Sequence, residues 1–188
     1  MDTVTIIIIV VIVLLAIGLI AWLAAKARRR QKLKESFGPE YDRTVGRSDD
    51  RREAEADLLE RQQRRDELHI QPLSDGARAK YAAAWDRVEA RFLEDPDGAA
   101  REGDQVVAEV MRERGYPVSG REHTDVLSVD HPELVERYRK GMATAAEPRS
   151  ASTEELRTAL LDLRSTFREL VDGGRNDATR DQETRDGH

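Results

Sequence analysis

A run of uncharged residues near the amino end most restricts what this chain can fold into. Residues 4–25 contain no charged side chain and consist mostly of Ile, Val, Leu and Ala. A helix of that length covers roughly 33 Å, and the hydrocarbon core of a bilayer is about 30 Å thick. In lipid, a single segment can pair all its backbone polar groups only as a helix. We therefore expect a transmembrane helix over 4–25, with a buried helix of a water-soluble protein as the alternative.

The residues that follow this run are strongly basic. Positions 26 to 34 carry six Lys or Arg residues and no Asp or Glu. Such residues flank membrane spans on the cytoplasmic side, and tryptophan at the end of a span prefers the headgroup level. The expected flank of the membrane anchor is Trp22, Lys26, Arg28, Arg29 and Arg30. This pattern predicts a single-pass protein of the cell membrane (inner or plasma), with the N-terminus outside and the C-terminal domain in the cytoplasm.

A cleaved signal peptide is the alternative interpretation of the same run. It would need a basic region before a shorter apolar stretch, and no Lys or Arg precedes residues 4–25. The chain contains no Cys, which excludes disulfides, thiolate metal sites and lipid attachment through cysteine. We expect a retained anchor, and a secreted or lipid-anchored product is the competing hypothesis.

The remainder of the chain is acidic and poor in aromatic residues. Of the 188 residues, 36% are charged and 5% are aromatic, so any core must be small and mostly aliphatic. Residues 35–188 hold 25 of the 31 basic and 36 of the 37 acidic residues. Nucleic-acid binding needs a basic surface. We therefore expect no nucleic-acid partner; the expected partners are the lipid bilayer and either a protein or a second copy of the chain.

A basic collar and juxtamembrane linker is expected over residues 26–50. Gly38 and Pro39 should interrupt helix there, because the residue before a proline avoids the α conformation. Near this break, Phe37 and Tyr41 are interpreted either as a hinge at the membrane interface or as a partner-docking motif.

A charged helical stalk is expected over residues 51–71. Ser48 or Asp49 can cap it, and acid-to-base pairs four residues apart support the helix. Its apolar positions are too few for a sustained coiled-coil seam. The segment is therefore expected to be solvated.

The body of the protein is expected over residues 73–172, as four amphipathic helices. Apolar residues recur there every three or four positions, and no stretch alternates long enough for a strand. An aromatic-rich stripe over 77–92 is expected to be core. The expected helix boundaries are marked by Ser74, Asp95-Pro96, Gly115, Asp130 (capping a helix over 131–142), Ser152 with Glu155, and Gly173-Gly174. Residues 173–188 are polar and expected to form a disordered tail, so the predicted fold class is all-α.

One cluster of potential metal ligands needs consideration. Two histidines and three carboxylates lie within eleven residues: His123, Asp125, Asp130, His131 and Glu133. Their spacing matches no HExxH or paired ExxH arrangement, and helix capping explains part of it. Phosphate-binding glycine loops are absent from the sequence. Arg112, Arg114 and Arg121 could hold an anion, although a solvated surface is the favoured interpretation. We predict no catalytic residue, no cofactor and no metal site.

Three short motifs resemble those of a known family. They are Phe37-Gly38-Pro39-Glu40-Tyr41-Asp42-Arg43, Arg114-Gly115-Tyr116-Pro117 and Ser128-Val129-Asp130-His131-Pro132. Together they resemble an uncharacterised family of short, single-pass membrane-anchored proteins of high-GC bacteria. The resemblance implies the same layout of an anchor and a helical body, and no activity.

These observations predict an interaction protein without catalytic activity. The expected function is a membrane-anchored scaffold that presents an acidic cytoplasmic domain. The candidate interaction residues are Phe37, Tyr41, Arg114, Tyr116, Pro117, Asp130 and His131. The alternatives are a metal-dependent enzyme or sensor that uses His123, Asp125 and His131, and a structural component of the cell-envelope or division machinery.

Overall fold

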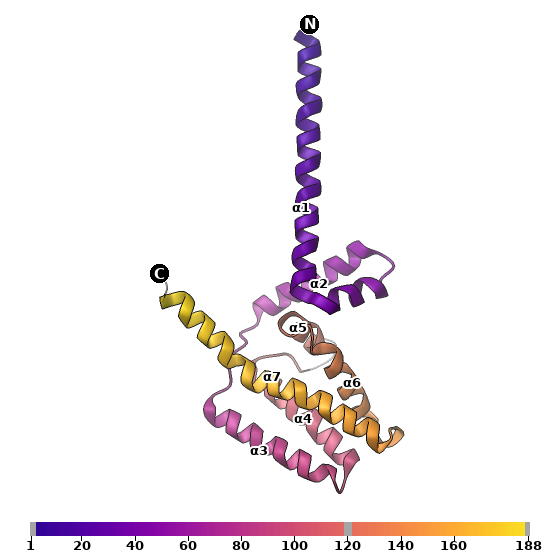
Figure 1. Cartoon of the computed structure of the whole chain (residues 1–188), viewed down its shortest axis with the longest axis vertical. Helices are drawn as coiled ribbons and strands as arrows, with labels where there is room; N and C mark the ends of the chain where they lie inside the picture. Colours follow the sequence, from indigo (N-terminus) through magenta and orange to yellow (C-terminus); the bar gives the residue numbers. More distant parts are fainter. Residues whose placement is uncertain (1–2, 119–121, 187–188) are drawn as a thin grey trace. The chain divides into compact units, whose positions relative to one another are not determined.

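The computed structural model describes the backbone of residues 3–118 and 122–186, and the side chains of residues 12–118 and 122–173. Within these ranges every regular element is helical, as Figure 1 shows, and no strand occurs. The helices are α1 (Thr3–Arg47), α2 (Arg51–Glu67), α3 (Asp75–Phe92), α4 (Pro96–Arg114), α5 (Glu122–Asp130), α6 (Val135–Ala146), the 3-10 helix η1 (Pro148–Ser150) and α7 (Thr153–Asp186). The predicted all-α class is confirmed.

The chain forms two compact units, Met1–Leu59 and Glu60–His188, and their boundary lies within α2. In the part of the chain that is described, no helix has the length and apolar content needed to cross a bilayer. The side chains of residues 4–11, the first part of the expected span, lie outside the described residues.

In the first unit, α1 bends sharply at Gly38. This residue has φ 44° and ψ −122°, which are not helical angles, and Pro39 follows it. Glycine tolerates a positive φ because it has no Cβ, and proline is compatible with the first turn of a new helix. The interruption expected here is confirmed. Helix continues on both sides of Gly38, so within the collar and linker expected over 26–50 only residues 48–50 lie outside α1 and α2.

The start of α2 is capped by a different residue from those expected. Asp50, rather than Ser48 or Asp49, accepts a hydrogen bond on its Oδ1 from the backbone N–H of Arg52 at 2.8 Å. The helix expected over 51–71 is found over Arg51–Glu67, but it is not fully solvated. Ala54 and Leu58 are buried, and the connection after α2 contributes Leu68 and Ile70 to the edge of the core.

The core of the second unit lies between α3, α4, α6 and α7. Figure 1 shows α3, α4 and α7 side by side. The aromatic-rich stripe of α3 is buried through Tyr81, Trp85 and Val88, as expected. Trp85 stacks on Phe167 of α7, with ring centroids 4.7 Å apart. Five of the α7 positions that bury apolar side chains here are Leu156, Leu160, Leu163, Leu170 and Val171.

Hydrogen bonds confirm several of the residues that were predicted to cap the start of a helix. Ser74 accepts from the N–H of Ala77 at 3.2 Å, and Asp95 accepts from the N–H of Gly98 at 2.9 Å. The N–H of Ser152 donates to Glu155 at 2.7 Å and the N–H of Glu155 to the Ser152 hydroxyl at 3.3 Å, so these two residues form a capping box.

The region before α6 differs from the expectation. The body has an additional helix, α5, and therefore contains five α-helices within the described residues instead of the expected four. Asp130 ends α5 and does not cap α6, which begins at Val135 without a side-chain cap. The N–H of His131 still bonds Leu127 O at 2.8 Å, and Pro132 then stops the chain from continuing as helix.

The last helix passes through the glycine pair that was expected to end it. α7 includes Gly173 and Gly174 and continues to Asp186. The tail expected to be disordered over 173–188 is therefore helical as far as Asp186, and residues 187–188 lie outside the described residues. Glycine costs a helix only about 1 kcal/mol relative to alanine, and no proline follows to enforce a stop.

Candidate functional site

A group of connected polar side chains in the second unit surrounds the end of α4. Gly115 ends that helix in the left-handed conformation with φ 98°. A Cβ at this position would lie 2.5 Å from the backbone oxygen of His69. The N–H of Gln71 donates to Arg114 O at 2.8 Å. The end of α4 is therefore in direct backbone contact with the segment that joins α2 to α3.

Arg114 binds three parts of the second unit together. It is 4% exposed, its Nε donates to Gln71 O at 3.2 Å, and one terminal nitrogen donates to Leu170 O at 3.0 Å. Its guanidinium lies 5.5 Å from the centroid of the Tyr116 ring. Buried carbonyl oxygens need donors, and the five N–H groups of a guanidinium can supply several at once. Arg114 therefore joins α4, the α2–α3 connection and α7.

Asp130 accepts hydrogen bonds from two further side chains. The Tyr116 hydroxyl donates to its Oδ2 at 2.7 Å, and Arg65 Nε donates to its Oδ1 at 2.6 Å. Burial, assisted by the charge of Asp130, raises the pKa of Tyr116 far above its ordinary value. Tyr116 thus stays protonated and acts as a hydrogen-bond donor. This arrangement fixes α5 against the segment after α4 and against α2.

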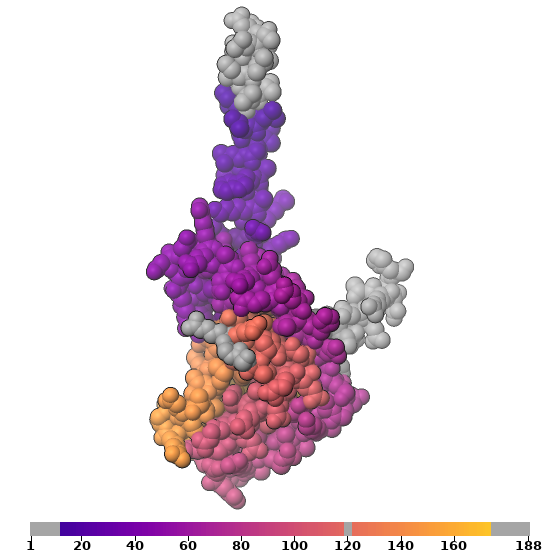
Figure 2. All heavy atoms as spheres, turned by 180° about the vertical axis from the view of Figure 1, so that it is seen from behind, coloured from indigo at the N-terminus to yellow at the C-terminus, as the bar shows by residue number. Residues whose placement is uncertain are grey.

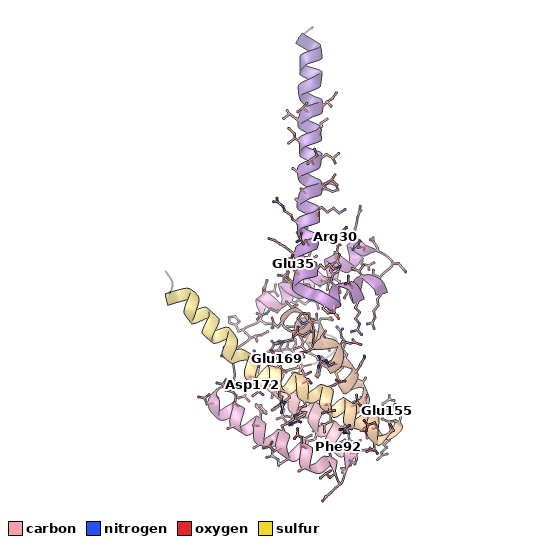
Figure 3. All side chains as sticks on the ribbon, viewed as in Figure 1. Arg30, Glu35, Phe92, Glu155, Glu169 and Asp172 are labelled. Atoms are coloured by element: carbon pink, nitrogen blue, oxygen red, sulfur yellow. The ribbon has the colours of Figure 1, made fainter. Side chains whose placement is uncertain are left out.

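His131 lies beside this network. Its Nδ1 is 3.8 Å from a carboxylate oxygen of Glu169, which is labelled in Figure 3 on α7. Burial is the largest influence on the imidazole and lowers its pKa, although Asp130 and Glu169 oppose that effect. The histidine is therefore mainly neutral near pH 7.

The other residues of the suspected metal cluster have separate surroundings. Asp125 lies 3.4 Å from Arg61 and 3.9 Å from Arg139. The His123 ring meets the Tyr138 ring edge-on at 5.7 Å, and its Nε2 lies 3.4 Å from the sulfur of Met142. Within the ranges that the structure describes, no group of three or more His, Asp or Glu side chains could hold a metal ion.

No family model, curated protein or solved structure matches this chain. The resemblance to membrane-anchored proteins of high-GC bacteria therefore stays a prediction.

The fold brings together two of the three motifs singled out in the sequence. Arg114 and Tyr116 of one motif contact the same network as Asp130 and His131 of the other, and Pro117 is partly exposed next to them. Arg112 is exposed and Arg121 lies outside the described residues, so the three arginines considered as an anion clamp are not seen together. Arg114 instead donates hydrogen bonds to two backbone oxygens.

The third motif lies in the first unit and is also buried. Phe37 is 0% and Tyr41 1% exposed, and the Tyr41 hydroxyl donates to Glu55 at 2.9 Å. Arg30, labelled in Figure 3, donates to the same carboxylate at 3.0 Å. Glu40 of this motif is 3% exposed, and Arg43 lies 3.7 Å from it. Six of the seven candidate interaction residues thus have packing or polar contacts inside the protein, and three of the seven (Pro117, Asp130 and His131) are partly exposed.

Sequence reasoning missed the role of α2 in this site. Arg61 and Arg65, four residues apart, bind Asp125 and Asp130 of α5. The available signal was that both arginines share a helix face with Leu58 and Leu68, which marks that face as packed. In this network Arg65, Arg114 and the Tyr116 hydroxyl all donate to acceptors of the protein itself, and these bonds join α2, α4, α5 and α7.

Proposed function

We propose that this chain is a single-pass membrane protein that presents its helical second unit in the cytoplasm as an interaction domain. The observation that carries the proposal is the exposure of large apolar side chains on every side of α1. Nine such residues are between 49% and 68% exposed: Ile12, Val13, Leu14, Leu15, Ile17, Leu19, Ile20, Trp22 and Leu23. In Figure 2 the part of α1 that carries these residues is drawn in indigo.

Leaving these side chains in water would be costly. Full burial of one large apolar side chain is worth roughly 1.5–3 kcal/mol, so nine of them represent more than about 10 kcal/mol. A bilayer removes this cost without requiring a protein partner on each face of the helix. The sequence adds that the uncharged run extends from 4 to 25, which is long enough to span.

The proposed orientation rests on the collar. Six basic residues follow the run directly, and no Lys or Arg precedes it. This asymmetry supports a cytoplasmic location for everything after the collar. The acidic character of residues 35–188 fits a domain that stays off an anionic membrane surface.

An interaction role rather than catalysis is supported by the polar network around Asp130, because Arg65, Arg114 and Tyr116 use their donors within the protein. A partner would therefore bind the outer surface, where Leu93 is 88% and Leu161 48% exposed. A protein partner or a second copy of the chain are both consistent with this surface.

Alkaline carbonate extraction of membranes tests the anchor. The full chain should remain in the membrane pellet. A variant with Leu15→Lys and Leu19→Lys should move to the soluble fraction, whereas Leu93→Lys, which adds a charge at an exposed leucine of the second unit, should stay in the pellet. Release of the unaltered chain by carbonate would contradict the proposal.

Protease added to intact spheroplasts tests the orientation. The second unit should survive until the membrane is permeabilised. Cleavage of the second unit in intact spheroplasts would reverse the proposed topology.

Cross-linking in intact membranes, followed by size measurement in detergent, tests the interaction role. The expected product is one stoichiometric complex or a homo-oligomer. A single-sized monomer under both conditions would count against an interaction domain.

A further inference from the structure

A recess of about 530 Å³ lies within the first unit, between the collar of α1 and the first half of α2. Its lining consists of Trp22, Ala25, Lys26, Arg29 and Leu33 from α1 and Arg52, Glu55, Ala56 and Leu59 from α2. The α1 residues recur at spacings of three and four, so they share one helix face. The recess therefore begins where the apolar run of the sequence ends.

Positive charge dominates this recess. Lys26, Arg29 and Arg52 are its cations, and within the described residues none of the three forms an ion pair with a carboxylate. Lys26 Nζ lies 5.3 Å from the centroid of the Trp22 ring, which leaves its N–H groups able to bind a ligand. Converging Lys and Arg side chains without carboxylate partners are suited to a phosphate group.

Glu55 is the single carboxylate among the described residues that line the recess, and neighbouring groups balance its charge. Glu55 accepts from Arg30 at 3.0 Å and from the Tyr41 hydroxyl at 2.9 Å, and Arg51 Nε lies 3.4 Å away. Its charge is thus balanced by groups outside the recess. An anion bound between the three cations would meet little repulsion from it.

The rest of the lining is apolar. Trp22, Ala25 and Leu33 face Ala56 and Leu59 of α2. A free phosphate ion would leave these side chains in contact with water, whereas the glycerol and the first acyl carbons of a phospholipid would cover them. Tryptophan side chains also prefer the headgroup level of a bilayer.

We propose that this recess binds the phosphate-bearing headgroup of an anionic glycerophospholipid. Lys26, Arg29 and Arg52 contact the phosphate, and the apolar lining contacts the glycerol backbone. The inference rests on the proposed membrane anchoring, since it places the recess at headgroup depth. It adds one defined lipid site to the general attraction of a basic collar.

Native mass spectrometry of the full chain in detergent tests this site. The probes are phosphatidylglycerol and phosphatidylcholine with identical acyl chains, titrated separately, and inorganic phosphate as a competitor. The unaltered chain should retain one phosphatidylglycerol in preference to phosphatidylcholine. The variant Lys26→Gln, Arg29→Gln, Arg52→Gln should lose that preference by roughly tenfold or more.

A matched control carries the same loss of charge outside the recess. The variant Arg28→Gln, Lys32→Gln, Arg47→Gln removes three basic residues of the first unit that do not line it. It should keep the preference for a single phosphatidylglycerol.

Equal losses in both variants would overturn the proposal in favour of diffuse attraction. Unchanged binding in the recess variant would overturn it as well, provided that the circular dichroism spectrum shows the variant folded. The single variant Arg29→Gln, which disturbs the fold less, should show an intermediate loss.

Two further outcomes separate the possible sources of failure. Displacement of the lipid by millimolar inorganic phosphate would identify a free-phosphate site and overturn the lipid assignment. Release of the chain from membranes by carbonate would instead refute the anchor. The lipid titration in detergent does not depend on that result, so the two ideas can fail separately.

Discussion

Asp130 joins side chains that lie far apart in the sequence, and its charge is expected to contribute measurably to stability. Asp130→Asn keeps the shape but weakens the bonds from Arg65 and the Tyr116 hydroxyl, at 2.6 and 2.7 Å. The expected loss is about 2 kcal/mol, because the pair is only partly buried. Urea unfolding of the detergent-solubilised chain measures it. Asp66→Asn, at an exposed position of α2, should change stability by less than about 0.5 kcal/mol. Equal effects of the two changes would contradict the role of the network.

Asp104 is expected to make the second unit less stable as the pH rises. Burial raises the pKa of this α4 carboxyl from 3.8 to about 6, and its Oδ1 has no hydrogen-bond partner. Because the folded state holds the proton more tightly than the unfolded chain, stability should fall as the pH increases from about 4 to 6 and stay lower above that range. Asp104→Asn should remove this decline and raise the melting temperature at pH 7.

The measurement is the melting temperature of each variant between pH 4 and pH 8. Asp86→Asn, at an exposed position of α3, is the matched control and should leave the pH profile unchanged. A profile of Asp104→Asn parallel to that of the unaltered chain would contradict the prediction.

At the scale of elements, the turn after α4 depends on the absence of a side chain at Gly115. Gly115→Ala adds a Cβ to a residue with φ 98° and places it 2.5 Å from His69 O. Strain of this kind costs roughly 1–3 kcal/mol, and the displaced α2–α3 connection adds to it. Gly76→Ala, in the first turn of α3 with no atom within 4 Å, should be neutral or slightly stabilising. Thermal unfolding of both variants checks this, and equal melting temperatures would refute the argument.

The sequence allowed most helix starts to be predicted, since Ser74, Asp95 and the Ser152–Glu155 pair act within a single turn. It did not allow the path of the chain from α5 to α6 to be predicted. Asp130 and Pro132 have the composition of a helix start, but the carboxylate is taken by Arg65 and Tyr116, which are distant in sequence. The candidate site was missed for the same reason, because its residues come from α2, α4, α5 and α7.

At the scale of the whole molecule, the second unit should fold without the first. Every residue of its hydrophobic core, with those packed against it, lies between Leu68 and Val171. A fragment of residues 60–173 should therefore be soluble without detergent and unfold in one cooperative transition. Circular dichroism and the fluorescence of Trp85, the only tryptophan left in that fragment, measure this. A broad, non-cooperative melt would show that the unit depends on the preceding helix.

The position of the bend at Gly38 also determines the direction in which α2 leaves the axis of α1. Each residue of an α-helix turns the chain by about 100°, so the direction in which α2 leaves depends on the number of residues before the bend. Inserting one residue between Leu33 and Phe37 would swing α2 roughly a quarter-turn away from the Trp22–Lys26–Arg29 face. Arg52 would then point elsewhere around the helix axis, while composition, charge and hydrophobicity stayed almost the same. The number of residues between the apolar run and the bend therefore determines whether Arg52 lies on the same side of the helix axis as Lys26 and Arg29.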